Sequence, residues 1–203
     1  MKHLILIALA VAAILGAQAR TALDFFVDAP SNEVPLLSMP KRLDMVDYFN
    51  NGLPNTVVNE LAGNSRIVEA SERRMVAQIT DHTSLELDVL TAGNDTVIAL
   101  ITTVLLPMAD SNIVFYDSDW KPLRRQPGMP GIQEFAASEQ QADELYAAVP
   151  IFFVRATYRP DDGVFVFTNT SAAYFADNER PEVLLSVPAA IERKFSNGKW
   201  RKP

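Results

Sequence analysis

The sequence contains no cysteine, only two histidines and only eight glycines. Without cysteine the chain has no disulfides, no Cys–His dyad and no thiolate-bound zinc site. His82 is the one histidine outside the N-terminal segment, and no nucleophile-elbow pattern accompanies it, so it is interpreted as a turn residue. No glycine-rich phosphate-binding loop is present. These absences predict a protein that is not an enzyme and needs no cofactor.

Basic residues are also scarce. Lysine and arginine total 18 against 25 aspartates and glutamates, giving a formal net charge of −7. An acidic chain repels the phosphate backbone of nucleic acids. The basic pairs Arg73-Arg74 and Arg124-Arg125 are isolated and form no stripe. We therefore expect no nucleic-acid partner.

A long apolar run occurs only at the N-terminus. Leu4 to Gly16 is apolar throughout, follows Lys2, and precedes the small-x-small sequence Ala17-Gln18-Ala19. This order is typical of a secretory signal peptide. We expect residues 1–19 to be that peptide, with cleavage after Ala19.

The signal pattern predicts an exported protein. Because no cysteine follows the signal segment, a lipoprotein is not expected. The longest later apolar run, Val97 to Met108, has the length of a strand rather than of a membrane span. We expect no stable membrane insertion after signal cleavage.

The first half of the mature chain reads as one helix followed by strands. The proline-rich segment before Ser38 is expected to be extended, and Ser38 is a candidate N-cap for a helix over Met39 to Asn50. The stretch "SLELDVLT", residues 84–91, alternates apolar and acidic residues, which predicts a strand with one solvated face. Residues 96–106 are apolar and β-branched, as in a strand buried on both faces.

The second half repeats this order. Residues 124–131 are rich in proline and glycine and indicate a linker, after which the apolar spacing predicts a helix over residues 132–149. "IFFVRATYR" and "VFVFTNT" flank a Pro-Asp-Asp-Gly turn and predict a hairpin. A last hairpin is expected around Asn197-Gly198.

These patterns predict an α+β fold, mainly antiparallel sheet, with helices preceding each strand set. One domain over residues 20–203 is favoured, with possible sub-units 20–123 and 132–203. Trp120 and Trp200, 80 residues apart, each follow an aromatic residue and a polar turn. The chain is therefore possibly a duplicated α-then-β-meander unit.

Three aspartates are the metal candidates. Asp110, Asp117 and Asp119 lie near one another in sequence, and carboxylates in acidic loops are typical calcium ligands. The segment lacks the glycine and the downstream glutamate of an EF-hand loop. Turn formation by aspartate side chains is the favoured interpretation.

Two further sets of residues could bind or cleave a sugar. Trp120, Trp200 and Tyr116 could form a stacking platform, although core packing is the favoured interpretation. A carboxylate pair could support glycoside hydrolysis. The candidates for it, Glu139, Asp143 and Glu144, fall on the polar side of a predicted helix, where solvated charge is the better explanation.

Three motifs carry a resemblance to a known family. They are the Arg-Leu-Asp helix at Arg42 to Tyr48, the Asn-x-Leu-x-Gly turn at Asn59 to Gly63, and the stretch Asp110 to Trp120 that ends in Asp-Trp. Over Pro35 to Leu123 the chain resembles a family of uncharacterised exported proteins from Bacteroidales. That resemblance implies a signal peptide and a periplasmic or secreted location in the Gram-negative envelope, and it supplies no catalytic residues.

The leading hypothesis is a non-catalytic envelope protein that binds a protein or peptide partner. The alternatives are a carbohydrate-binding module that uses exposed tryptophans and a hydrolase that uses carboxylates. Exposure of both tryptophans beside one groove would favour the first alternative. Carboxylates that converge in one cleft would favour the second.

Overall fold

The computed structural model describes residues 19–93, 95–105 and 107–203. Residues 1–18, which make up almost all of the predicted signal peptide, lie outside this part of the chain. The described residues form an α+β fold with two antiparallel sheets, as the sequence predicts. No helix within them has the length and apolar character needed to cross a membrane.

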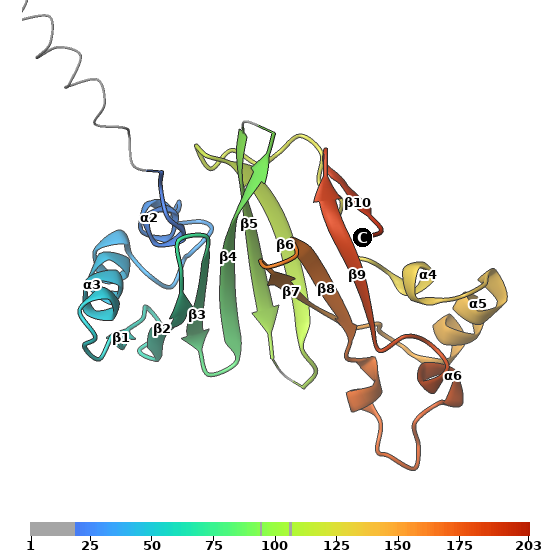
Figure 1. The fold of residues 1–203 in the computed structure, drawn as a ribbon. Helices are drawn as coiled ribbons and strands as arrows, with labels where there is room; N and C mark the ends of the chain where they lie inside the picture. The colour runs from blue at the N-terminus through green and yellow to red at the C-terminus, as the bar shows by residue number, and fades with distance from the viewer. Residues whose placement is uncertain (1–18, 94, 106) are drawn as a thin grey trace, which may run out of the picture.

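The first sheet is preceded by two helices and contains six strands. The helices are α2 (Ala22–Asp28) and α3 (Met39–Asn50). The strands are β1 (Val57–Val58), β2 (Asn64–Ala70), β3 (Arg74–Thr80), β4 (Thr83–Ala92), β5 (Asp95–Val104) and β6 (Asp110–Asp117). They lie side by side in chain order, so each strand pairs with the next one along the chain (Figure 1).

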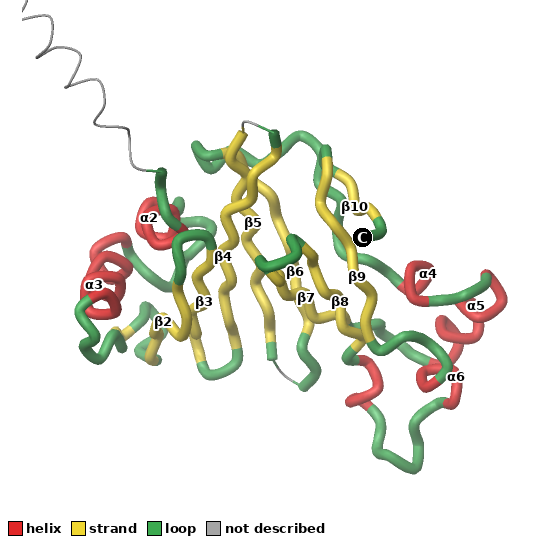
Figure 2. Tube along the Cα trace, viewed as in Figure 1, coloured by secondary structure: helices red, strands yellow, loops and turns green. Residues whose placement is uncertain are grey.

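The second sheet has four strands and more helical insertions. The elements are α4 (Ile132–Phe135), α5 (Glu139–Ala148), β7 (Val154–Arg159), β8 (Val164–Asn169), the 3₁₀ turn η1 (Ser171–Tyr174), α6 (Glu182–Leu185), β9 (Ala190–Ser196) and β10 (Lys199–Arg201). Its strands are also paired in chain order. Figure 2 shows the strands in the middle of the molecule, with helices at both ends.

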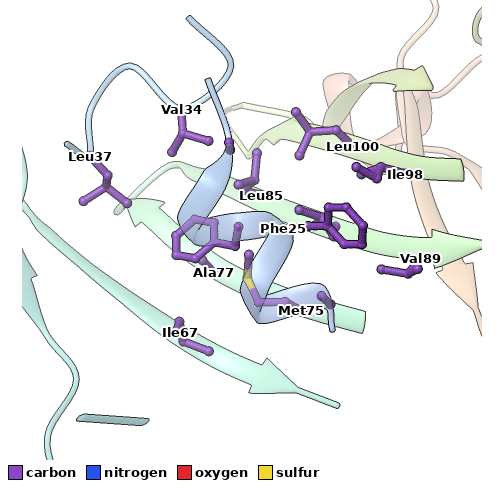
Figure 3. Close-up of a cluster of buried hydrophobic side chains, with 14 of the residues drawn as sticks. Phe25, Val34, Leu37, Ile67, Met75, Ala77, Leu85, Val89, Ile98 and Leu100 are labelled. Atoms are coloured by element: carbon purple, nitrogen blue, oxygen red, sulfur yellow. The ribbon is translucent and has the colours of Figure 1, made fainter. Parts of the chain in front are cut away.

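One core lies between α2 and the six-stranded sheet. Phe25 and Phe26 of α2 are buried against Met75, Leu87 and further apolar residues of β2 to β5 (Figure 3). Alternate residues of β4 and β5 point toward the helix, as the pleat of a strand requires. This face of the sheet is therefore covered by helix.

A second core lies between the two sheets. Ala99 and Ile101 of β5 and Phe115 of β6 are buried together with Phe165 and Phe167 of β8. Strand β5 contributes to both cores and is buried on both faces, as predicted from its continuous apolar sequence. The sheets of the two predicted sub-units therefore share one interior.

The prediction of an extended segment before Ser38 is wrong over Ala22–Asp28, which form helix α2. Its first turn is held by a capping box, in which the Thr21 hydroxyl accepts from the Asp24 N–H while the Asp24 carboxylate accepts from the Thr21 N–H. The prolines that suggested extended chain all lie after this helix. The bounds of the next helix, Met39–Asn50, agree with the prediction.

The single helix predicted over residues 132–149 is two helices. The chain is extended at Ala136, which ends the first helix. A second helix begins after Ser138, whose hydroxyl accepts from the Gln141 N–H. A good N-cap in the middle of an apolar stripe starts a new helix at that point. The stripe is preserved, because Ile132 and Leu145 are buried in one cluster with residues near α6.

The solvated face predicted for β4 is wrong. Glu86 and Asp88 were expected to face water, but their exposed fractions are 7% and 0%. The second sheet covers them, because they point away from α2 and toward β7.

Candidate functional site

Phe115 of the first tryptophan stretch meets Phe195 and Trp200 of the second stretch between the sheets. Phe115 stacks on Phe195 with a distance of 3.9 Å between ring centroids and an angle of 7° between the rings. Trp200 meets Phe115 edge-on at 5.6 Å. The Trp200 indole N–H donates to the Gly128 carbonyl at 2.7 Å. These contacts tie β6, β9, β10 and the linker into one aromatic cluster.

Trp120 lies on the other side of the six-stranded sheet. It is 8% exposed and packs in the helix-covered core beside Tyr116, with 5.2 Å between ring centroids. Tyr116 is itself buried, and its hydroxyl donates to Glu33. Successive residues of a strand point to opposite faces of the sheet. Phe115, which contacts Trp200, and Tyr116, which contacts Trp120, therefore lie on opposite faces. Trp120, Trp200 and Tyr116 therefore form no common platform for a sugar.

The three aspartates are separated and have different partners. One oxygen of Asp117 accepts from the N–H groups of Asp119, at 2.9 Å, and Lys121, at 3.0 Å, which stabilises the turn after β6. Asp119 is exposed and pairs with Lys121. Asp110 is at the other end of β6, where it accepts from the Val154 N–H at 3.2 Å.

The length of β6 places Asp110 and Asp117 about 23 Å apart, at roughly 3.3 Å per residue. Within residues 19–93, 95–105 and 107–203, no three His, Asp or Glu side chains are arranged to hold a metal ion. Trp120 in this turn has a φ of +62°, an unusual value for a bulky residue, and its buried ring offsets that strain.

The candidates for hydrolysis are exposed. Glu139 and Asp143 line a hollow of about 500 Å³ between α4 and α5, and Glu144 accepts from Gln140 on the same helix. Residues four apart on a helix project from one side, so Glu139 and Asp143 do not face each other across the hollow. His82 is exposed in the turn between β3 and β4.

A buried ionic cluster between the sheets was not predicted. Nη1 of Arg74 lies 2.6 Å from Glu86 Oε1 and 3.4 Å from Asp88 Oδ1. The same nitrogen donates to the Tyr158 carbonyl at 2.5 Å, while the Tyr158 N–H donates to Glu86 at 2.6 Å. Arg74 and Glu86 therefore bond the β7 backbone as a neighbouring strand would.

Side chains bond the rest of this edge of β7 in the same way. The Ala156 N–H donates to the Ser111 hydroxyl at 2.9 Å, and the Val154 N–H donates to Asp110. Alternate N–H groups of β7 thus find acceptors on β4 and β6 instead of a strand partner. We call this row of contacts the β7 latch.

The other notable surface is apolar and exposed. Of the twelve large hydrophobic side chains that are exposed among the described residues, seven lie between residues 39 and 68. They are Met39, Leu43, Tyr48, Leu53, Val58, Leu61 and Val68. We call this set the edge surface, because it lies on α3, β1, β2 and the segments that join them, at one end of the six-stranded sheet (Figure 1).

The β2 edge is only partly paired there. Strand β1 has two residues and pairs with Asn64 and Ser65 alone. The Ile67 N–H donates to the Asn55 side chain at 2.7 Å. No strand in the described part of the chain pairs with the outer edge of β2 beyond this point.

A hollow adjoins this end of the sheet. It has a volume of about 460 Å³ and is formed where α2, the end of α3 and the end of β2 meet. Leu23, Val46, Phe49 and Ala70 supply its apolar lining, and charged residues such as Glu72 stand at its rim.

The chain matches no curated protein. The solved structure of a domain of an uncharacterized protein from Porphyromonas gingivalis W83 is similar, with a TM-score of 0.74 and 20% sequence identity. The match covers 92% of this chain and 99% of that one. At this identity the likeness establishes the fold and nothing about function.

A family model describes nearly the whole chain, matching residues 14–200. Together with the Porphyromonas structure, it confirms the resemblance to uncharacterised proteins of Bacteroidales that the motifs indicated. The chain belongs to the family described as proteins of unknown function, DUF3256.

Proposed function

We propose that this protein is a non-catalytic, exported envelope protein that binds a protein or peptide partner through the edge surface. The observation that carries the proposal is the gathering of exposed apolar side chains on α3, β1 and β2. Exposed apolar side chains on adjoining elements are typical of protein–protein contact sites in soluble domains. The signal-like N-terminus supports export.

Two features of the edge surface favour a peptide segment. Beyond Ile67 the outer edge of β2 has no strand partner among the described residues, so its main-chain groups are available to an extended chain. The neighbouring hollow lined by Leu23, Val46 and Phe49 accepts an apolar anchor. Main-chain pairing supplies affinity and the anchor supplies specificity.

The charge of α3 favours a basic partner. Asp44 and Asp47 are exposed on the same helix as Leu43 and Tyr48. Lys41, the nearest cation on that helix, already pairs with Glu60 at 2.8 Å. A segment with apolar residues flanked by lysine or arginine complements this surface, and its association rate would fall as salt increases.

Site-specific photocrosslinking in the native host tests the proposal. A photoreactive residue is placed at Leu61 or Val68 of the edge surface, and for control at Ile151 or Leu185, which are equally exposed elsewhere. We expect one adduct of defined mass from the edge positions only, and its loss when Leu43→Ser is added. Adducts of equal yield from Leu185 would overturn the assignment of the surface.

A further inference from the structure

Asp88 is a buried acid whose partner is already engaged. Its side chain is 0% exposed, and Oδ2 has no hydrogen-bond partner among the described residues. Its other oxygen lies 3.4 Å from Arg74, which is beyond a good charge-assisted hydrogen bond. Arg74 is much closer to Glu86, at 2.6 Å. One guanidinium therefore serves two buried carboxylates.

Glu86 has closer hydrogen-bond donors than Asp88. Its Oε1 accepts from Arg74 and also from the Tyr158 N–H, both at 2.6 Å. Two such donors stabilise a carboxylate, whereas Asp88 has only the long contact to Arg74. A negative charge on Asp88 would be desolvated and beside a second negative charge.

We propose that Asp88 is protonated in the folded protein and that its ionisation opens the β7 latch, so that the two sheets separate along β7. A charged Asp88 competes with Glu86 and with the Tyr158 carbonyl for Arg74. It also draws water toward the buried carboxylates. Both effects break the contacts that Arg74 and Glu86 make with the β7 backbone.

The other charged groups around Asp88 include a third carboxylate on Arg74. Glu69 of β2 lies 3.3 Å from Arg74 Nε, and it is exposed. On β5 the residue paired with Asp88 is Ala99, which carries no charge. The remaining ionisable groups that face the cluster are Arg73 beside β3, and Tyr158 from β7 with Asp162 in the turn after it. Arg73 donates to Thr91, and Asp162 pairs with Arg159 at 2.7 Å.

The direction of the pKa shift agrees with the geometry. Burial raises the pKa of Asp88 well above 3.8, and the Glu86 charge raises it further, while Arg74 lowers it. An acid whose pKa is higher in the folded state than in the unfolded state contributes its full stability below the pKa of the unfolded state. That contribution is lost as the pH rises through the pKa of the folded state. Between the two pKa values the folding equilibrium constant falls about tenfold for each pH unit.

Urea unfolding and amide exchange of the wild type and Asp88→Asn, between about pH 5 and about pH 9, test the proposal. The range starts above the ordinary aspartate pKa of about 3.9. In the wild type we expect stability and the exchange protection of the Tyr158 and Ala156 amides to fall as the pH rises, each by more than about tenfold. In Asp88→Asn the fall is absent or below about threefold.

Asp81→Asn, in the exposed turn between β3 and β4, is the matched control and follows the wild type. A pH profile of Asp88→Asn that parallels the wild type overturns the proposal. If the variant does not fold, the carboxyl carbon resonance of Asp88 in the wild type decides. A protonated carboxyl near pH 7 supports the proposal, and an ionised one overturns it.

Discussion

Strand β4 is buried on both sides, and the two sides are buried by different chemistry. Leu85, Leu87 and Val89 lie in the apolar core that α2 covers. Glu86 and Asp88, which alternate with them, face the second sheet and bond Arg74 and β7. The helix-covered face is stabilised by apolar burial, which has no direction. The sheet-covered face depends on directed bonds, so losing one partner leaves others unsatisfied.

This difference matters for how the two sheets are positioned. An apolar interface tolerates small shifts if volume is conserved, whereas the Arg74–Glu86 pair fits the β7 backbone in one register only. We infer that the ionic cluster selects the alignment of the sheets, while the aromatic cluster around Phe115 supplies apolar burial. The following predictions are ordered by expected effect.

Arg74→Met should cause the largest loss of stability. It leaves the Glu86 charge buried without its cation and removes a donor to the Tyr158 carbonyl. We expect a loss of about 3–5 kcal/mol in the free energy of unfolding. Arg66→Met, at an exposed position of β2, is the control and should change the free energy of unfolding by less than about 0.5 kcal/mol. Equal effects from the two variants would contradict a special role for the ionic face.

Leu87→Ala tests the apolar face at a neighbouring position of the same strand. Leu87 is 0% exposed and lies under α2. Removing its isopropyl group should lower the free energy of unfolding by about 3 kcal/mol, through lost burial and a residual cavity. Urea unfolding at two pH values distinguishes the faces. The loss from Leu87→Ala should not depend on pH, and a marked dependence would show that the two faces are coupled.

Arg42→Lys addresses the buried cation of the helix layer. Arg42 is 1% exposed, and its guanidinium donates to the carbonyls of Val27, Leu37 and Ala29. Burial lowers its pKa, although Asp28 opposes this. A lysine cannot reach all three carbonyls, and we expect a loss of about 2 kcal/mol by thermal or urea unfolding. Arg155→Lys, on the exposed side of β7, is its control.

Tyr116→Phe should have a smaller effect on the helix-covered face. The change removes only the hydroxyl that donates to Glu33. Burial raises the pKa of Tyr116, and the hydrogen bond to Glu33 raises it further. We expect a loss of about 1 kcal/mol, against almost none for Tyr174→Phe, which is exposed. Loss of more than about 3 kcal/mol would mean that the hydroxyl holds more than one bond.

Calcium should have the smallest effect. Asp117 already accepts two backbone N–H groups, and Asp110 accepts one at the far end of β6. We expect calcium at about 1 mM, a concentration that fills weak extracellular sites, to leave Trp120 emission and the unfolding midpoint unchanged. A saturable change in emission would restore the metal hypothesis.

Local patterns in the sequence predicted much of the fold. Ser38, as a candidate N-cap, located the start of α3 correctly, although its side chain makes no cap hydrogen bond. The turn at Asn197-Gly198 has φ values of 51° and 70°, as a tight hairpin requires, and it lies where predicted. These features are set by residues close in sequence, which is why one sequence reveals them.

The ionic cluster could not be predicted in the same way. The alternation in "SLELDVLT" reported the two faces of β4 correctly but not what covers each one. The cover over Glu86 and Asp88 comes from Tyr158, about 70 residues later, and uses its backbone rather than its side chain. A main-chain partner has no residue type that a sequence pattern could show. The edge surface was likewise not predicted, because its exposed apolar residues are of the same types as those of the core.

The β7 latch has a consequence for how copies of this protein meet. An unpaired strand edge is a template on which a second chain can add its own strand, and this is a common route to aggregation. Asp110, Ser111 and Glu86 occupy the alternate N–H groups of β7 that such a chain would bond. Sheet growth from one molecule to the next is thereby blocked at β7, while the outer edge of β2 remains open to a partner.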